Sequence, residues 1–277
     1  MKYQLLAVDI DGTLVNSSGE LTPATRAALR RAVAAGVHVV LATGRRYGRV
    51  LHLVEPIGIA VPLVTASGAL VKHPADHRTI FRAEFDEAVL GELLGFLLET
   101  GHPPVLSVDH YTEGFEFWCR VENLDDRDVA AFIARNPARV RIWTGSLDRI
   151  PPATFAGFVM ASHDEMLDVE RAIHARWPGR FATHVLRSPQ YEGFLCEFMP
   201  AGTSKWWAIE RLAADWGIGH DAICAVGDDV NDIQMIREAG LGVAMGNALP
   251  LVKAVADRIA PGHDEDGVAT VVDWILE

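Results

Sequence analysis

Short apolar runs alternate with amphipathic segments at the start of the chain. The run at 5–8 is followed by an alanine-rich segment that begins at Thr22-Pro23 and ends at Gly36, and a second apolar run occupies 37–42. Continuous apolar runs of this length are typical of buried parallel strands, while Thr-Pro and Gly mark the start and end of a helix. The pattern predicts a right-handed βαβ unit, whose two strands end at the same edge of a sheet.

The same pattern continues beyond this unit, and it changes twice. We expect a helix at 47–57, strands at 61–65 and 79–81, and a turn at 69–71 between them. A mixed block follows, with helices at 86–100, 125–135 and 164–177 and strands at 105–108, 115–121, 140–143, 154–161 and 180–186. The βα alternation then resumes with strands at 194–198, 222–226 and 241–245, a helix that carries Lys205, a helix that runs to Glu238 and a terminal helix.

The change of pattern predicts an α/β protein in which a parallel-sheet domain is interrupted by a second domain. We expect residues 1–83 and 188–277 to form the parallel-sheet domain and residues 84–187 to form an inserted α+β domain. A chain of 277 residues is long enough for one domain with another inserted into it.

The composition indicates which kinds of molecule the protein can bind. The net charge of −12 argues against nucleic acid, whose phosphates demand a basic face, but a local cation can still hold a small phosphorylated metabolite. Cys119, Cys196 and Cys224 are too far apart for a zinc cluster and are expected to be buried thiols of a reducing cytosol. No apolar run is long enough to span a bilayer, so we expect a cytoplasmic protein with no membrane partner. The oligomeric state is not encoded in any pattern that we find.

The first strand ends in two carboxylates. Asp9 and Asp11 follow its apolar residues, and Gly12 permits a sharp turn immediately afterwards. Ligands of open α/β sheets bind at the carboxyl ends of strands, and two acids one residue apart there suit a nucleophile and a metal. The alternative is a solvated strand end followed by an Asp-Gly turn.

Two further segments carry groups that suit a phosphate. Thr43 and Gly44 end the second strand, and a hydroxyl with the backbone N–H groups of a glycine turn can bind a phosphoryl oxygen. Thr43 could instead cap a helix. Lys205 lies in the first turn of a helix, where a cation opposes the macrodipole, so a bound anion would explain its place. A solvated surface lysine is the alternative.

A second strand also ends in acids. The strand at 222–226 is followed by Gly227-Asp228-Asp229-Val230-Asn231-Asp232. Together with Asp9 and Asp11 these residues form an oxygen-rich set that suits Mg²⁺, whereas zinc is disfavoured because no histidine or cysteine accompanies them. Asp228 and Asp229 could otherwise simply cap the following helix.

These segments resemble a known family. Asp9-Ile10-Asp11-Gly12-Thr13, Thr43-Gly44-Arg45, Lys205 and Gly227–Asp232 resemble the four ordered motifs of the haloacid dehalogenase superfamily. The inserted block, together with Ala244-Met245-Gly246-Asn247-Ala248 and Asp266-Gly267-Val268, resembles its Cof-type sugar-phosphate phosphatases. The resemblance implies a Rossmann-like core covered by a mobile cap.

The resemblance also implies roles. Asp9 would attack the phosphoryl group and form an aspartyl-phosphate, and Asp11 would be the general acid and base. Mg²⁺ would be held by the carboxylates of Asp9 and Asp228 and by the backbone carbonyl of Asp11. The phosphate would lie among Gly12, Thr43, Gly44, Arg45, Lys205 and Asn231, with Asp232 orienting Lys205 or a water on the metal.

Three positions depart from the family pattern, and two other functions stay open. Ser67 stands where asparagine is frequent, Trp206 where glycine is common, and Asp229 where a small residue is usual. The expected activity is phosphatase. The alternatives are a phosphomutase or phosphotransferase that uses the same aspartyl-phosphate, and a catalytically silent phosphosugar-binding protein. Tyr111, Phe117 and Trp118 could stack on a sugar, but we expect aromatic residues of the cap to form its core.

Overall fold

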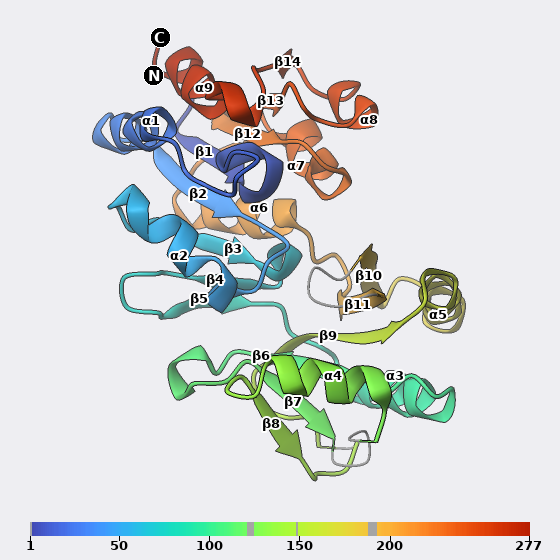
Figure 1. The fold of residues 1–277 in the computed structure, drawn as a ribbon. Helices are drawn as coiled ribbons and strands as arrows, with labels where there is room; N and C mark the ends of the chain where they lie inside the picture. The colour runs from blue at the N-terminus through green and yellow to red at the C-terminus, as the bar shows by residue number, and fades with distance from the viewer. Residues whose placement is uncertain (1, 121–124, 148, 188–192) are drawn as a thin grey trace. The chain divides into compact units, whose positions relative to one another are not determined.

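The computed structural model describes residues 2–120, 125–147, 149–187 and 193–277, which form two compact units. The first unit contains Met1–Phe81 and Ser204–Glu277, and the second contains Arg82–Thr203. The chain leaves the first unit after Phe81 and returns to it at Ser204, as the colours of Figure 1 show.

The first unit is built on a mainly parallel sheet. Its strand order is β14-β13-β12-β1-β2-β3-β4-β5, and neighbouring strands from β14 to β3 run parallel, whereas β4 runs antiparallel to β3. The strands are β1 (Leu5–Asp9), β2 (His38–Ala42), β3 (Leu63–Thr65), β4 (Leu70–Lys72), β5 (Thr79–Arg82), β12 (Ile223–Gly227), β13 (Leu241–Ala244) and β14 (Arg258–Ile259).

Helices pack in pairs around this sheet. Helix α1 packs beside α9, and α6 packs beside α7. The expected N-cap of the first helix is confirmed, because the Thr22 side chain accepts a hydrogen bond from the backbone N–H of Thr25 at 3.1 Å. The helices of this unit are α1 (Pro23–Ala34), α2 (Leu51–Val54), α6 (Lys205–Asp215), α7 (Ile233–Glu238), α8 (Pro250–Lys253) and α9 (Gly267–Leu276).

The central strands β1 and β12 are buried and, apart from Asp9 at the end of β1, contain no charged residue. Every residue of β1 and β12 is buried, and β1 pairs with β12 on one side and β2 on the other. This register brings the carboxyl ends of three strands, far apart in sequence, to one edge of the sheet. The predicted convergence of these strand ends is thereby confirmed.

The second unit has a different sheet. Its strand order is β10-β11-β9-β6-β7-β8, and adjacent strands are antiparallel except for β7 and β8. Leucines of α3 and apolar residues of α5 pack with one face of this sheet, and Val129 and Phe132 of α4 pack with the other. The elements are α3 (Glu87–Glu99), α4 (Arg127–Arg135), α5 (His163–Arg176), β6 (Val105–Val108), β7 (Phe117–Arg120), β8 (Val140–Trp143), β9 (Thr154–Ala161), β10 (Phe181–Arg187) and β11 (Phe194–Pro200).

The strand at 194–198 belongs to a different sheet from the one predicted. It was expected to resume the parallel sheet, but β11 pairs antiparallel with both β9 and β10 in the second unit. The second boundary therefore falls between Thr203 and Ser204 rather than between residues 187 and 188. Residue 188, like the expected strand end at Val121, lies outside the described residues.

Two local predictions also differ from the structure. The helix expected at 47–57 is broken into the short helix α2 and flanking 3₁₀ turns, where Gly48 and Pro56 interrupt a regular helix. Of the turn expected at 69–71, Leu70 and Val71 belong instead to β4, whereas Ala69 lies in a turn just before it. Leu70 and Val71 are extended because they pair with β3.

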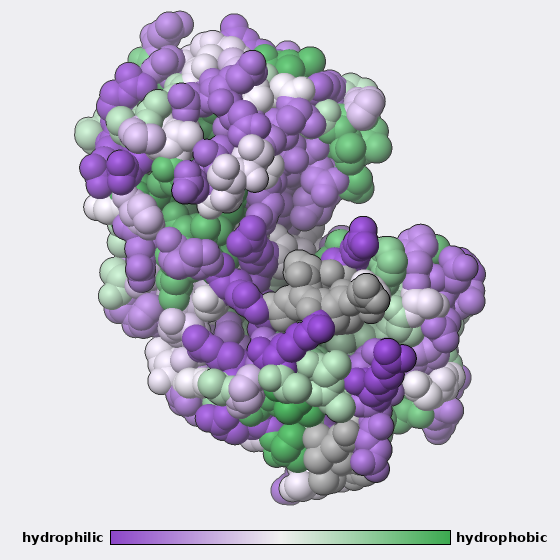
Figure 2. All heavy atoms as spheres, in the orientation of Figure 1, coloured by the Kyte–Doolittle hydropathy of each residue, from purple (hydrophilic) through white to green (hydrophobic). Residues whose placement is uncertain are grey.

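The exposed surface is mostly hydrophilic in the view of Figure 2, in keeping with the net charge of −12. Apolar residues gather on that face over α8, where Leu249 and Leu251 are exposed. All three cysteines are buried, as expected. No helix within the described ranges combines the length and apolar character needed to cross a membrane.

Candidate active site

The first motif leaves β1 at Asp9 and turns at Gly12. Gly12 has a φ of +77°, and a Cβ at this position would collide with the carboxylate of Asp228. The Thr13 hydroxyl donates to Asp228 Oδ1 at 2.8 Å, and the Asn247 side-chain amide donates to the Gly12 carbonyl at 2.8 Å. Glycine is required here both by the left-handed backbone and by the close approach of Asp228.

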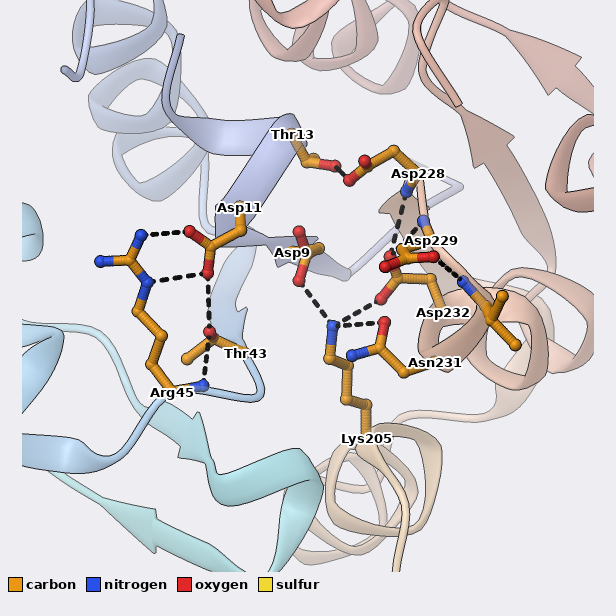
Figure 3. Close-up of polar contacts among 11 residues, drawn as sticks. Asp9, Asp11, Thr13, Thr43, Arg45, Lys205, Asp228, Asp229, Asn231 and Asp232 are labelled. Carbon is orange, nitrogen blue, oxygen red and sulfur yellow. Dashed lines mark hydrogen bonds and ion pairs between the residues drawn. The ribbon is translucent and has the colours of Figure 1, made fainter. Parts of the chain in front are cut away.

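Lys205 lies at the centre of the site (Figure 3). Its side chain is 1% exposed, and its Nζ donates to Asp9 Oδ1 at 2.5 Å, to Asp232 Oδ1 at 2.7 Å and to Asn231 Oδ1 at 3.2 Å. The interpretation of Lys205 as a solvated surface residue is therefore wrong. Its place in the first turn of α6 is offset by two buried carboxylates.

The loop after β12 is shaped around Asp232. The second carboxylate oxygen of Asp232 accepts the backbone N–H groups of Asp228 at 3.0 Å and of Asp229 at 3.1 Å. A Cβ on Gly227 would collide with the Asp232 side chain, so the glycine allows the loop to close over this carboxylate. Asp232 thus fixes the direction of Asp228 through the backbone and touches Lys205 directly.

Burial and crowding change the acidities of these groups. Burial, followed by the neighbouring Asp232 carboxylate, raises the pKa of Asp9 well above its usual range, although Lys205 opposes the change. Burial raises the pKa of Asp228 to about 6 against the opposite effect of the Thr13 hydrogen bond. Burial disfavours the ammonium of Lys205, but Asp9 and Asp232 outweigh it and raise its pKa. The single positive charge of Lys205 does not balance the negative charges of the carboxylates around it.

The same carboxylates fit a cation. Asp9, Asp228 and Asp232 each place one carboxylate oxygen so that these three atoms lie within 4.8 Å of one another. The set contains oxygen donors only, which suits a hard cation such as Mg²⁺ better than zinc. The pKa values of Asp9 and Asp228 are raised, so their negative charges are not fully balanced by neighbouring positive charge. A bound divalent cation would supply that positive charge.

Asp11 lies apart from these carboxylates. Figure 3 shows its side chain directed toward Thr43 and Arg45, whereas that of Asp9 is directed toward Lys205. Asp11 Oδ2 accepts from Arg45 Nε at 2.9 Å and from the Thr43 hydroxyl at 3.3 Å, and Asp11 Oδ1 accepts from Arg45 Nη2. The Asp11 side chain is 45% exposed, so this carboxylate remains open to water.

Nearly all of the sequence-predicted site residues come from four segments of the first unit that meet at one sheet edge. The structure brings Asp9, Lys205, Asp228, Asn231 and Asp232 together, and it places Asp11 with Thr43 and Arg45 beside them. Gly44 lies close to Asn231, and Gly12 lies against Asp228.

Two contacting residues, Thr13 and Asn247, had no role assigned from the sequence. Thr13 follows Gly12 directly, so its position in the motif could have signalled its bond to Asp228. Asn247 lies 235 positions from Gly12, and the turn sequence around it gives no sign of a side-chain bond to that carbonyl. Only the folded chain reveals this contact.

The structure shows what surrounds two of the positions that depart from the family pattern and two of the aromatic candidates. Trp206 is buried, with its ring centroid 4.9 Å from that of His220, and Asp229 accepts a bond from the N–H of Val230 at 2.7 Å. In the second unit Phe117 is fully buried and Trp118 packs at the edge of a core, which supports their interpretation as core residues.

The first unit combines a mainly parallel sheet with a buried lysine and carboxylates at the carboxyl ends of its strands. This arrangement is typical of α/β enzymes, whose ligands bind at that edge. A family model described as haloacid dehalogenase-like hydrolase matches residues 6–272. The chain therefore belongs to the haloacid dehalogenase-like hydrolases, in agreement with the motifs.

Named relatives and solved structures cover the whole chain. It is 27% identical to phosphatase YwpJ of Bacillus subtilis over 99% of this chain and 100% of that protein. It is 28% identical to the 5-amino-6-(5-phospho-D-ribitylamino)uracil phosphatase YcsE of the same organism, over 99% and 96% of the two chains. A haloacid dehalogenase-like hydrolase from Bacteroides thetaiotaomicron is 27% identical, covers 99% of this chain and 100% of its own, and superposes with a TM-score of 0.76.

Proposed function

We propose that the protein is a Mg²⁺-dependent phosphatase that hydrolyses small phosphorylated metabolites, sugar phosphates among them, through an aspartyl-phosphate on Asp9. The observation that supports it most strongly is the buried cluster in which Lys205 holds Asp9 and Asp232 while Asp228 lies within reach of a shared cation. Relatives named as phosphatases, one of them acting on a phosphoribityl compound, support the same class of substrate.

Asp9 is the proposed nucleophile. Its carboxylate forms a bond to phosphorus as the ester P–O bond breaks, and Lys205 orients this carboxylate and balances charge on the phosphoryl oxygens. Asp9, Asp228 and the backbone carbonyl of Asp11 would hold Mg²⁺, which supplies neutralisation of the phosphoryl charge when bound.

Asp11 is the proposed general acid and base. It gives a proton to the leaving alkoxide and later takes one from the water that attacks the aspartyl-phosphate, so that inorganic phosphate leaves and the Asp9 carboxylate is restored. Its separation from Lys205 and its contact with water suit proton exchange. Arg45 now pairs with Asp11, so its proposed contact with a substrate anion requires that pair to open.

The remaining proposed contacts surround the phosphoryl group. Thr43, Gly44 and Gly12 provide hydroxyl or backbone donors, and Asn231 provides its amide. Asp232 is a positioning residue, because it contacts Lys205 and the backbone of Asp228 rather than the substrate.

Phosphate release from an aryl phosphate tests the proposal. The wild type is expected to be active with Mg²⁺ and inactive with EDTA, and Asp9→Asn is expected to lose about 10⁴-fold or more in kcat, since the nucleophile is gone. Circular dichroism of the variant should match the wild type. Activity that survives chelation would remove the metal from the proposal, and turnover by Asp9→Asn would remove the nucleophile.

A further inference from the structure

The turn after β3 carries backbone strain beside the site. Ala66 has a φ of +47° and Ser67 a φ of +53°, and neither residue is glycine. L-residues with a side chain disfavour this left-handed conformation, and where it persists the surrounding structure imposes it, most often near functional sites. The surroundings of this turn show what imposes it.

The turn is bonded to the loop that contains Thr43 and Arg45. The Ala66 N–H donates to the Arg45 carbonyl at 2.9 Å, and the Ser67 N–H donates to the Thr43 carbonyl at 3.1 Å. These two bonds flank Gly44. On the other side, a Cβ on Gly68 would collide with the backbone carbonyl of Ser204, next to Lys205. The turn is therefore held firmly between the phosphate-binding loop and the start of α6.

Within the described ranges we find no hydrogen bond made by the Ser67 hydroxyl, and the residue as a whole is 3% exposed. It lies 3.5 Å from the point that a Cβ on Gly44 would occupy, and Asn231 Nδ2 lies 3.8 Å from the same point. Since Gly44 does not adopt a left-handed φ, its backbone does not require glycine, and the missing side chain leaves a small space between two hydrogen-bond donors.

The donors around this space are oriented by their neighbours. The side-chain oxygen of Asn231 accepts a hydrogen bond from Lys205 (Figure 3). This leaves the NH₂ group of Asn231 for the space beside Gly44. A hydroxyl, an amide N–H and a nearby ammonium together suit an anionic oxygen.

We infer that the Ser67 hydroxyl donates a hydrogen bond to an oxygen of the substrate phosphoryl group, opposite Asn231 and beside Gly44. The inference rests on the proposed phosphatase function and adds to it a substrate contact supplied by a fifth segment of the chain. It also gives a reason for the strained backbone, which aims this hydroxyl at Gly44.

Binding of inorganic phosphate with Mg²⁺, measured by calorimetry, tests the contact without relying on turnover. Ser67→Ala keeps the side-chain volume but removes the donor, and it is expected to weaken phosphate binding roughly fivefold to tenfold. The value of kcat/KM should fall by a similar factor for every ester, because the phosphoryl group is common to all of them.

Two further variants separate binding from folding. Ser67→Gly removes the hydroxyl and relieves the left-handed strain, so it should raise Tm and yet bind phosphate as poorly as Ser67→Ala. Ser67→Asn restores an N–H donor on a residue that tolerates this conformation and should recover much of the affinity.

Unchanged phosphate binding in Ser67→Ala would overturn the inference while an active wild type and an inactive Asp9→Asn kept the proposed function. A loss in kcat/KM that varies with the leaving group, with phosphate binding unchanged, would also overturn it, since the hydroxyl would then touch the organic part. Weaker phosphate binding in Ser67→Ala, in a protein that hydrolyses no ester, would sink the proposed function and leave the contact standing.

Discussion

The two sheets of this protein use their strands in opposite ways. In the first unit β12, β1 and β2 are parallel, and polar residues lie at the same edge: Asp9 ends β1, Thr43 follows β2 and Asp228 follows β12. In the second unit the strands are mostly antiparallel and bury Phe117, Phe158 and Phe198. Parallel pairing gathers strand ends, whereas antiparallel pairing sends successive ends to opposite edges.

The two units also differ in how they bury charged groups. The first unit buries an ammonium and two carboxylates because each has partners, and the second relies on apolar packing on both faces of its sheet. Removing a group from the first unit should therefore damage chemistry most, and removing one from the second should damage stability most.

Lys205→Met should give the largest effect of the variants that probe this difference. It leaves the carboxylates of Asp9 and Asp232 buried without their cation, a loss of about 3–5 kcal/mol in the free energy of unfolding. Without this donor kcat for an aryl phosphate should fall by about 10²–10³-fold. Chemical denaturation and initial rates would measure both, with exposed Lys2→Met as the matched control. Near-native stability and rate would contradict the assigned role of Lys205.

Phe117→Ala probes the second unit. Removing this fully buried ring should cost about 3–5 kcal/mol in the stability of that unit. Because the chemistry is assigned to the first unit, kcat for a small aryl phosphate should stay within the same order of magnitude at a temperature below both unfolding transitions. Ile142→Ala, on a half-exposed side chain of the same sheet, is the control and should cost about 0.5 kcal/mol or less. A kcat that collapses with Phe117→Ala would assign chemistry to the second unit.

The smallest expected effect is the pH dependence of the metal-free protein. The pKa of Asp228 is about 6 in the fold against 3.8 for the free group, so the folded state binds its proton more tightly. Its contribution to stability is complete below about pH 4 and is lost as the pH rises through 6.

Thermal unfolding in EDTA measures this effect. Relative to Asp228→Asn, the wild type should lose about 2 °C in Tm between pH 4 and 7, a modest value because Asp228 is only partly buried. Saturating Mg²⁺ should raise Tm more at pH 7 than at pH 5. Parallel pH profiles of the two proteins would contradict the raised pKa.

The convergence of the candidate site residues in the first unit was largely predictable from the sequence. Apolar runs that stop at Asp9, Thr43 and Asp228 fix strand ends, and the rules for parallel sheets place those ends together. The position of Lys205 against the helix dipole likewise indicated an anion nearby, and two carboxylates lie there.

The side-chain directions within the site were not predictable. Asp9 and Asp11 are separated by one residue, yet one contacts Lys205 and the other contacts Arg45. Asp9 is the last residue of β1 and Asp11 already lies outside it, so the two side chains need not share a face as they would on a continuous strand. The bond from Asn247 to the Gly12 carbonyl is set by tertiary packing and has no sequence signal.

The boundary of the second unit was missed for a related reason. The sequence of β11 fits a strand of a parallel sheet as well as a strand of an antiparallel sheet. Only its pairing with β9 and β10 in the structure shows that it is antiparallel and belongs to the second unit. The two-residue strand β14 was too short to leave any periodic signal.

The position of β1 between β2 and β12 has a consequence for biosynthesis. One neighbour of β1 lies about thirty residues downstream, but the other begins only at Ile223, so a nascent chain exposes one edge of this buried strand until β12 has been made. The carboxylates of Asp9 and Asp228 cannot meet until the ribosome has made the whole segment that separates them. Nascent chains shorter than this should therefore depend on chaperones and lack catalytic competence.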